Sequence, residues 1–275
     1  MKNIIVTGGA GFIGSNFVHY VVNNHPDIRI TVLDKLTYAG NKENLAGLPA
    51  DRVELVVGDI ADAELVDRLV KDTDAVVHYA AESHNDNSLK DPFPFVQTNI
   101  IGTYTLIEAC RKHNVRYHHI STDEVYGALG AEGYFMETTP LCPHSPYSAS
   151  KASADMFVKA FHDTYGMPIN ITRCSNNYGP YQFPEKLIPL LINNAKQHKQ
   201  LPVYGDGMQI RDWLYVKDHC SAIRRVLEAG KVGETYNVGG WNEQPNIHIV
   251  NTVCALLDEL RPRAHWHSYR SQITY

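Results

Sequence analysis

The sequence predicts an α/β fold: a Rossmann-type, doubly wound parallel sheet with a smaller C-terminal lobe. Three observations carry this prediction. Strands and helices alternate through the first half of the chain, the strands are apolar throughout, and a glycine-rich turn joins the first strand to the first helix. Strands that are apolar on both faces and separated by helices are typical of parallel sheets covered by helices.

The expected elements follow from short apolar runs and from helical spacing of apolar residues. Strands are predicted at about residues 4–6, 28–33, 53–57, 75–77, 115–120 and 169–172. Helices are predicted at about residues 12–24, 63–70, 93–113 and 145–165, and a last one ends near residue 260. In the second helix, Leu65, Val66, Leu69 and Val70 recur at helical spacing.

The chain is less regular after residue 173, where prolines and glycines cluster. Such stretches are typical of loops that cap a ligand cleft rather than of a packed core. We therefore expect a dinucleotide-binding domain at residues 1–173 and a second lobe at residues 174–275, interleaved with the first. A chain of 275 residues is long enough for this arrangement.

Composition excludes several other classes of protein. The formal net charge of −5 argues against a general nucleic-acid binder, because no basic excess is present to neutralise phosphates. The five cysteines have no CxxC spacing, which favours free thiols in a reducing cytoplasm. His118 and His119 are expected on opposite faces of a strand, and His265 and His267 in a loop; we interpret both pairs as structural, so no metal site is expected.

No membrane segment is expected either. No apolar run approaches the roughly 18 residues that a spanning helix needs. The apolar run at the N-terminus breaks at Gly8 and Gly9, so we interpret it as a strand and not as a signal peptide.

The glycine-rich turn predicts a dinucleotide site. Its glycines fit two spacings, Gly9-x-Gly11-x-x-Gly14 and Gly8-x-x-Gly11-x-x-Gly14. Such glycines permit the tight turn and a close approach of the pyrophosphate, which the start of the next helix attracts. Asp34 ends the second strand about 20 residues later, where a carboxylate binds ribose hydroxyls and favours NAD over NADP. A structural turn without a ligand is the alternative interpretation.

A second motif, Tyr147-x-x-x-Lys151, is expected near the start of a helix, where the spacing places both side chains on one face. A nearby ammonium, together with a positive nicotinamide ring, lowers the pKa of a tyrosine and lets it act as a base. With the glycine turn before it, this pair resembles the extended branch of the short-chain dehydrogenase/reductase superfamily.

A third element, Ser121–Gly127, follows the strand at residues 115–120. Its adjacent acids Asp123 and Glu124 suggest proton transfers beyond those of a simple oxidoreductase, although adjacent acids at a strand end are often only a solvated turn. With Thr122 before them and the tyrosine–lysine pair after them, they resemble the dTDP-glucose 4,6-dehydratase family. Further segments similar to that family are Lys35–Asn41, Ala80–His84, Cys174–Tyr181, Glu185–Pro189 and Gln209–Trp213.

The resemblance implies a lyase that uses one bound NAD for three steps: oxidation at C4 of the sugar, loss of water across C5 and C6, and reduction at C6. By similarity, Tyr147 is the base at the 4-hydroxyl, and Lys151 orients the ribose. Glu124 removes the C5 proton, Asp123 protonates the departing 6-hydroxyl, and Thr122 binds the 4-oxygen. Asp123 then needs a raised pKa, which we expect from burial beside Glu124.

The resemblance also implies ligand contacts. Expected contacts to NAD are Gly8, Gly11, Phe12, Ile13, Gly14, Asp34, Lys35, Leu36, Thr37, Asp59, Ile60, Ala80, Ala81, Ser83, Thr98, Tyr147, Lys151 and Asn177. Expected contacts to the dTDP-sugar are Ser83, His84, Thr122, Asn176, Lys186, Leu187, Pro202, Val203, Tyr204, Arg211 and Asn246. Members of the family pair as homodimers through two helices, which here correspond to residues 93–113 and 147–165.

Chains of the family continue beyond the segment Gln272–Tyr275, so this sequence is expected to lack a C-terminal stretch that helps hold the nucleotide diphosphate. Three alternatives stay open. A nucleotide-sugar 4-epimerase shares the glycine turn and the tyrosine–lysine pair but lacks the acid pair, and a GDP-mannose dehydratase keeps the glutamate without the preceding aspartate. The third is an inactive form that binds NAD without turnover.

Overall fold

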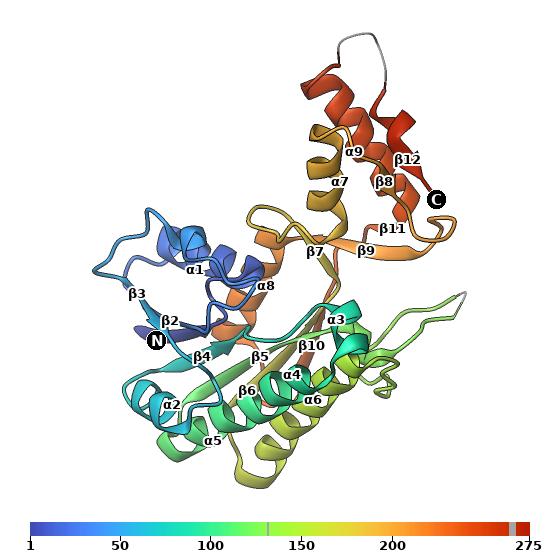
Figure 1. Cartoon of the computed structure of the whole chain (residues 1–275). Helices are drawn as coiled ribbons and strands as arrows, with labels where there is room; N and C mark the ends of the chain where they lie inside the picture. The colour runs from blue at the N-terminus through green and yellow to red at the C-terminus, as the bar shows by residue number, and fades with distance from the viewer. Residues whose placement is uncertain (131, 264–267) are drawn as a thin grey trace. The chain divides into compact units, whose positions relative to one another are not determined.

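The computed structural model describes residues 1–130, 132–263 and 268–275 (Figure 1). The described chain forms two compact units. The first unit comprises residues 1–174 and 216–238, and the second comprises residues 175–215 and 239–275. The chain therefore leaves the first unit after residue 174 and returns to it once. The predicted loop that carries His265 and His267 lies outside the described residues.

The first unit contains a seven-stranded sheet in the order β10-β6-β5-β4-β1-β2-β3, and every neighbouring pair is parallel. The order reverses between β1 and β4, which is the doubly wound topology expected from the sequence. The strands are β1 (Asn3–Thr7), β2 (Arg29–Asp34), β3 (Val53–Val57), β4 (Ala75–His78), β5 (Arg116–Thr122), β6 (Ile169–Cys174) and β10 (Thr235–Val238).

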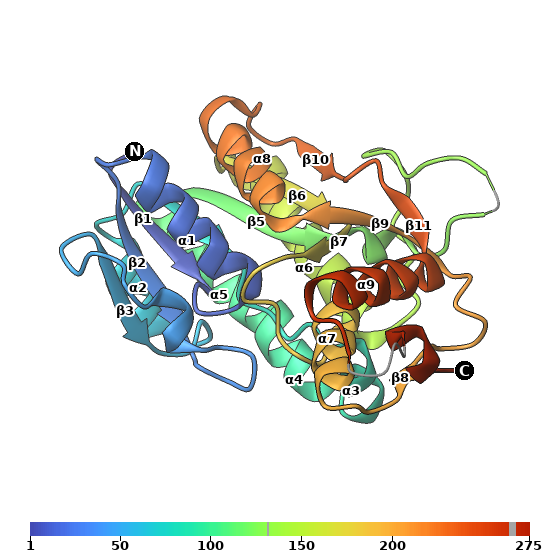
Figure 2. The ribbon, with the colours of Figure 1, turned by 90° about the horizontal axis from the view of Figure 1, so that it is seen from above.

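Helices cover both faces of this sheet (Figures 1 and 2). The helices α1 and α8 pack together on one face, whereas α2, α5 and α6 pack on the other. The longer helices of this unit are α1 (Phe12–Asn24), α2 (Ala63–Val70), α5 (Thr103–His113), α6 (Pro146–Tyr165) and α8 (Val216–Ala229). Shorter helical pieces are η1 (Lys42–Leu45), α3 (Asn85–Lys90) and η3 (Asp123–Tyr126).

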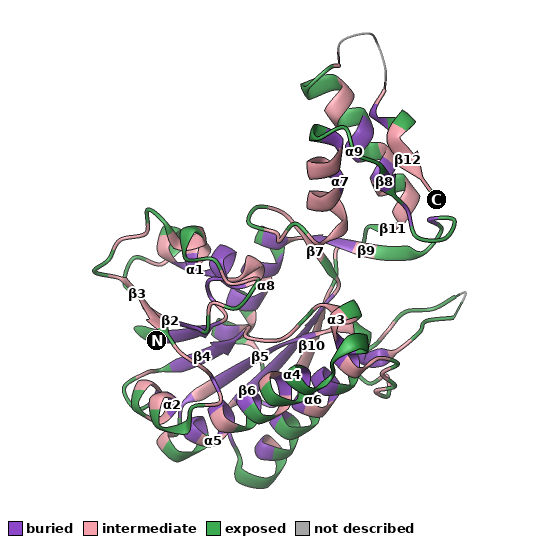
Figure 3. Cartoon of the chain, viewed as in Figure 1, coloured by how far each residue is buried: buried purple, intermediate pink, exposed green. Residues whose placement is uncertain are grey.

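The apolar strands form the core, as Figure 3 shows by the buried colour along the sheet. All four residues of β4 and all six of β6 are buried. On the α2, α5 and α6 side, Ile5, Val76 and Tyr117 from the strands pack in one cluster with Leu106 and Val158 from the helices. Because helices cover both faces of the sheet, binding and catalytic residues are expected in the loops at the ends of its strands.

The predicted helix at residues 93–113 is helical throughout but not uniform. It comprises α4 (Phe93–Phe95), the π-helix η2 (Val96–Gly102) and α5. Gly102 ends the π-helix against Ile60, whose Cδ1 lies 2.5 Å from the position of a Cβ at that glycine. π-Helical turns occur frequently at functional sites, and this one carries the buried Asn99.

The second unit has its own core, in which Leu191, Leu201, Val250, Val253 and Tyr269 are buried together. Its elements are β7 (Asn176–Tyr178), α7 (Leu187–Lys196), β8 (Leu201–Pro202), β9 (Ile210–Tyr215), β11 (Glu243–Pro245), α9 (Asn246–Leu260), η4 (Tyr269–Gln272) and β12 (Ile273–Thr274). The strands β11, β9 and β7 form a small sheet, and β12 pairs with β8.

The loops expected after residue 173 do not extend through residues 187–196, which form α7. Pro189 is the third residue of that helix. A proline in the first turn removes an N–H that has no partner inside the helix, so the helix tolerates it there.

His118 and His119 are both fully buried on β5, and they point to opposite faces as predicted. The Nε2 atom of His118 lies 3.1 Å from the Thr172 hydroxyl, whereas Nε2 of His119 lies 3.4 Å from Asp155 on α6. Among the residues that the structure describes, no group of three or more His, Cys, Asp or Glu could hold a metal ion. All five cysteines are free.

Within the described ranges, none of the helices combines the length and the apolar character needed to cross a membrane.

Candidate active site

The predicted site residues of the first unit gather where the strands of its sheet end. The glycine turn follows β1, Asp34 ends β2, Asp59 follows β3, and the loop from Ala80 follows β4. The register aligns these ends, because Thr7 pairs with both Leu33 and His78, and His78 pairs with His119. The β1–β4 boundary is the point where the strand order reverses, and ligands bind at such a point in this kind of sheet.

The glycine turn is fixed by close backbone packing. Gly8 has a φ of +67°, and a Cβ there would lie 2.6 Å from the Ala80 nitrogen. A Cβ on Gly14 would lie 2.3 Å from the Gly8 oxygen, so both positions are closed to larger residues by the protein itself. No side chain caps α1 at Gly11, and its first turn carries no acid. The N–H groups and the positive dipole end of α1 are thus suited to an anionic group.

Asp34 is buried and ties the glycine turn to the loop after β2. Its Oδ2 accepts from the Ala10 N–H at 2.9 Å, and its Oδ1 accepts from the Leu36 N–H at 2.8 Å. Each carboxylate oxygen has a further lone pair for a ribose hydroxyl. The residues after β1 and β2 therefore have the arrangement that an NAD adenosine and pyrophosphate would need, and their contacts to NAD stay predictions.

Two further predicted contacts pair with each other at the surface. Lys35 donates to Asp59 at 2.7 Å, and Asp59 also accepts from the Ala61 N–H at 2.9 Å. Burial raises the pKa of Asp59, but these two hydrogen bonds outweigh it, so the net pKa is lowered. Ile60 is 4% exposed and packs in the core under η2, so little of its side chain is left for a ligand.

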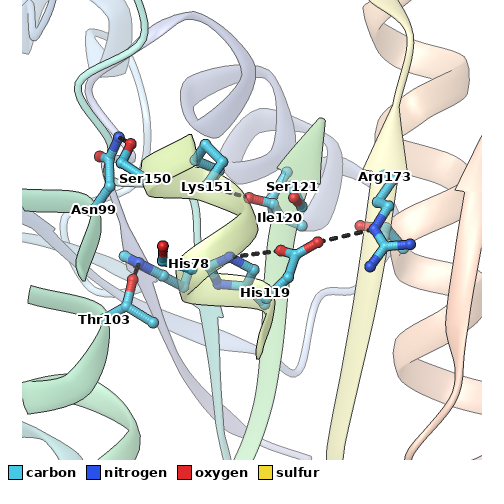
Figure 4. A network of polar contacts seen from close by, with 12 residues as sticks. His78, Asn99, Thr103, His119, Ile120, Ser121, Ser150, Lys151 and Arg173 are labelled. Carbon is cyan, nitrogen blue, oxygen red and sulfur yellow. Dashed lines mark hydrogen bonds and ion pairs between the residues drawn. The ribbon is translucent and has the colours of Figure 1, made fainter. Parts of the chain in front are cut away.

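The helix α6 presents Tyr147 and Lys151 from its first turns because its sequence sets where it begins. Ser145 accepts from the Ser148 N–H at 3.1 Å, Ser148 accepts from the Ser145 N–H at 3.0 Å, and Pro146 occupies the first turn. This reciprocal cap fixes the helix start one residue before Tyr147. The Lys151 ammonium is buried and donates to the Ile120 carbonyl of β5 at 2.8 Å (Figure 4).

Burial affects the protonation of both residues of this pair. Burial raises the pKa of Tyr147 well above its usual range, the Glu124 carboxylate raises it further, and the Thr122 hydroxyl lowers it. Lys151 is not among the causes, and burial lowers the pKa of Lys151 itself. In the chain alone, burial therefore sets the direction of the tyrosine pKa, and the expectation for the pair together with a nicotinamide ring stays a prediction.

The short helix η3, which carries Asp123 and Glu124, packs against α6, which carries Tyr147. Thr122 ends β5 and its hydroxyl caps η3, accepting from the Glu124 N–H at 3.3 Å. Glu124 is exposed and Asp123 is half-buried. The burial that we expected for this acid pair is therefore incomplete. The pair lies in the first turn of a short helix that follows the C-terminal end of β5.

Sequence reasoning missed Asn99. It is buried in η2, and its side chain binds both backbone polar groups of Glu82. The same side chain donates to the Ser150 hydroxyl (Figure 4). Ser150 in turn donates to the Tyr147 carbonyl at 2.7 Å. No sequence signal set Asn99 apart, because Gln97 and Thr98 are polar residues in the same helical stretch.

The remaining predicted contacts divide between the two units. The first unit holds Phe12, Ile13 and Thr37, together with Ala80, Ala81, Ser83, His84 and Thr98 after β4. The second unit holds Asn176, Asn177, Lys186, Leu187, Pro202, Val203, Tyr204, Arg211 and Asn246. Tyr204 is 81% exposed, whereas Val203 is 6% exposed and packs in the core of the second unit, which leaves mainly its backbone for a ligand.

Comparison with known proteins agrees with this geometry. The family model of GDP-mannose 4,6 dehydratase matches residues 5–273. A dTDP-glucose 4,6-dehydratase of Xanthomonas campestris pv. campestris is 55% identical over 288 aligned positions, which cover 100% of this chain and 82% of the relative.

Two solved structures of dTDP-glucose 4,6-dehydratases have the same fold. The Streptomyces venezuelae protein, crystallised with NAD, is 46% identical with a TM-score of 0.91, over 99% of this chain and 83% of the other. The Bacillus anthracis protein, also in complex with NAD, is 48% identical with a TM-score of 0.89, over 100% of this chain and 84% of the other.

The parallel sheet, the glycine turn and the tyrosine–lysine helix define a short-chain dehydrogenase/reductase. The chain belongs to the GDP-mannose 4,6 dehydratase family, and within it to the dTDP-glucose 4,6-dehydratases.

Proposed function

We propose that the chain is an NAD-dependent lyase that converts dTDP-glucose to dTDP-4-keto-6-deoxyglucose and water. One observation carries the proposal. The acid pair Asp123 and Glu124 lies in η3, which packs against α6, the helix that carries Tyr147, because Val125 and Tyr126 of η3 are buried together with Ala152 of α6. A dehydratase needs this combination, since it must oxidise the sugar and also move two protons during elimination.

NAD, when bound, would supply the hydride acceptor for C4 of the sugar and the hydride donor for C6. Tyr147 accepts the 4-hydroxyl proton, and Thr122 binds the same oxygen. The resulting ketone acidifies the C5 proton, which Glu124 removes, while Asp123 protonates the 6-hydroxyl so that it leaves as water. Glu124 then returns its proton to C5 as C6 is reduced. Lys151 supplies a positive charge next to the ribose.

The raised pKa of Tyr147 has a mechanistic consequence under this proposal. The groups of the chain keep the phenol protonated, with Glu124 contributing. A positive charge from outside the chain must stabilise the phenolate, and the nicotinamide ring would supply it.

The residues of the second unit complete the proposal. Lys186 and Arg211 are suited to the diphosphate by charge, and the Arg211 guanidinium keeps free donors beyond its contact with the Ile210 carbonyl. The other predicted contacts of this unit, Asn176, Leu187, Pro202, Tyr204 and Asn246, are proposed to hold the sugar and the nucleoside.

The direct experiment is incubation of the chain with NAD and dTDP-glucose, followed by the alkali-induced ultraviolet absorbance of the keto-deoxy product. Product from the parent chain is expected, with a loss of at least about 100-fold in kcat for Asp123→Asn, a typical contribution of general acid catalysis. Asp72→Asn, at an exposed acid after α2, is the matched control and should keep full activity. Release of dTDP-galactose instead of the keto product would identify a 4-epimerase. Bound NAD with no product from dTDP-glucose or GDP-mannose would identify an inactive form.

We further propose a cytoplasmic homodimer. Large apolar residues on the neighbouring elements α4, η2, α5 and α6 are exposed, namely Phe93, Val96, Ile101, Tyr104, Met156, Phe157 and Tyr165. Contiguous apolar surface of this kind marks protein–protein contacts, and a two-fold pair would cover it with its own copy. Five free thiols support a reducing compartment.

A further inference from the structure

Arg173 takes part in a buried network of polar contacts, at one end of the part that Figure 4 draws. Its side chain extends from β6 and is 7% exposed. The Nε atom donates to Oδ2 of Asp155 at 2.8 Å, and the Nη1 atom donates to the Tyr126 hydroxyl at 2.8 Å. The guanidinium carbon also lies 4.8 Å from the centre of the Tyr126 ring. One planar group therefore contacts two residues on different elements.

Both partners belong to elements that carry proposed catalytic residues. Asp155 lies on α6, one helical turn after Lys151 and two turns after Tyr147. Tyr126 is the last residue of η3, which begins with Asp123 and Glu124. The contacts of Arg173 thus join α6, which carries Tyr147 and Lys151, to η3, which carries Asp123 and Glu124.

We propose that Arg173 is a positioning residue that holds η3 in register with α6, so that Asp123 and Glu124 meet the same sugar that Tyr147 oxidises. The inference rests on the proposed function and deepens it. It assigns a role to Arg173, Asp155 and Tyr126, none of which need touch the substrate.

The contacts of Arg173 fit a role in holding η3 and α6 in place relative to each other better than a role in stability alone. Asp155 is 1% exposed, and a buried ion pair adds little net stability compared with apolar residues of the same size. A guanidinium is rigid and planar, so two of its donors fix the relative placement of their acceptors. Burial lowers the pKa of His119 to about 4, so the imidazole beside Asp155 is neutral and Arg173 is the charged partner of the carboxylate.

Tyr126 is also held from its other side. Its hydroxyl donates to Oδ1 of Asn237 on β10 at 2.7 Å, and its ring stacks on Phe135 with the centres 4.9 Å apart. The Asn237 amide donates to the Phe135 carbonyl at 3.1 Å. The end of η3 is therefore clamped between β6 and β10, the two strands at one edge of the large sheet.

Tyr126→Phe tests the proposal with little risk to folding. It removes the hydroxyl that links η3 to Arg173, but keeps the ring stack and the Asp155–Arg173 pair. Turnover of dTDP-glucose should fall about threefold to tenfold in kcat with KM unchanged, because η3 loses the hydrogen bonds of this hydroxyl to both Arg173 and Asn237. Reduced nicotinamide should accumulate during turnover, because oxidation at C4 continues while elimination slows.

Two further variants help to interpret the result, one as a control and one as a stronger disruption of the same contacts. Tyr236→Phe removes a hydroxyl that accepts from the Lys231 N–H, one residue from Asn237 on the same strand, and should behave as the parent. Arg173→Met should show the same accumulation more strongly, at a cost in stability because it leaves Asp155 buried without its partner. A Tyr126→Phe variant that turns over as the parent does, or that slows without accumulating reduced nicotinamide, would overturn the proposal.

Amide hydrogen exchange gives a readout that does not need turnover. In Tyr126→Phe, residues 122–127 should exchange faster than in the parent, while α6 stays as slow. Unchanged exchange in that segment would also overturn the proposal. If the parent chain forms no product, the proposed function fails, and the exchange measurement still decides whether Tyr126 holds η3.

Discussion

Asn99 binds Glu82 through both backbone polar groups of that residue: its amide oxygen accepts from the Glu82 N–H, and its amide nitrogen donates to the Glu82 carbonyl, each at 2.9 Å. The same nitrogen donates to the Ser150 hydroxyl at 2.8 Å. One side chain of the π-helix therefore ties the loop after β4 to the first turns of α6. That loop carries several of the predicted NAD contacts.

We expect Asn99→Ala to weaken NAD binding about tenfold, because the loop after β4 loses its anchor. The free energy of unfolding should fall by about 1–3 kcal/mol, since the Glu82 backbone groups and Ser150 lose their partner in a buried place. Calorimetric titration with NAD and denaturant unfolding measure the two effects. Asn24→Ala, which removes an exposed contact to the Tyr20 carbonyl on α1, should change neither. Parent-like NAD affinity in Asn99→Ala would contradict the assigned role.

The glycines of the turn allow a test that separates packing from ligand binding. At Gly11 a Cβ would meet only the Gly8 oxygen, at 3.2 Å, whereas at Gly14 it would meet that atom at 2.3 Å. Gly11→Ala should therefore fold with nearly the parent melting temperature but bind NAD at least about tenfold more weakly, because the methyl group points toward the pyrophosphate. Gly14→Ala should lose both stability and binding. Equal NAD affinity in Gly11→Ala and the parent would place the pyrophosphate elsewhere.

Buried histidines predict loss of stability in acid. Burial lowers the pKa of His118 and of His219 to about 3, from an unfolded value of 6.5. Below pH 6.5 the unfolded chain binds a proton at each of these imidazoles more readily than the folded chain does. The stability that each neutral imidazole contributes is therefore present above pH 6.5 and is lost as the pH falls toward 3. Lowering the pH from 7 to 5 should reduce the free energy of unfolding by about 2 kcal/mol for each of these imidazoles.

Urea unfolding at the two pH values checks this. His219→Gln should reduce the difference in unfolding free energy between pH 7 and pH 5 by about 2 kcal/mol, whatever its effect at pH 7. The exposed His248→Gln serves as the comparison and should keep the parent's pH dependence. An unchanged difference in His219→Gln would mean that His219 is accessible to protons in the folded chain.

The proposed dimer makes a further prediction. Phe157 on α6 is 42% exposed and packs edge-on against Tyr104 on α5, which is 45% exposed. Phe157→Glu places a charge in this apolar surface and should convert the dimer to a monomer in sedimentation or light scattering. Val57→Glu, at an equally apolar but separate exposed position on β3, should leave the assembly unchanged. If the parent chain sediments as a monomer, the proposal of a homodimer is wrong.

Much of the first unit could be predicted from the sequence because its signals are local. Runs such as Ala75–Val77 are apolar at every position, which only a strand covered on both faces or a buried helix explains. The start of α6 is encoded by Ser145, Pro146 and Ser148, three neighbouring residues. The glycine turn likewise needs only its own sequence to be recognised.

What the sequence could not reveal depends on residues far apart in the chain. The strand β10 is four residues long and is defined by its pairing with β6, about sixty positions earlier in the chain. The π-helical register of η2 reflects its packing and not its composition. Arg173 could have attracted attention as the single charged residue in a strand that is otherwise without charge, but its partners Asp155 and Tyr126 are visible only in the fold.

The return of residues 216–238 to the first unit has a consequence for how the chain emerges from the ribosome. When β6 has been synthesised, one of its edges has no neighbour, and the next stretch of chain belongs to the second unit. Only after Val238 has appeared can β10 cover that edge. Until then the nascent chain exposes an open row of backbone N–H and C=O groups, which is a template for pairing with another chain. Any fragment that ends before Thr235 would keep that edge open permanently, so we expect such fragments to aggregate.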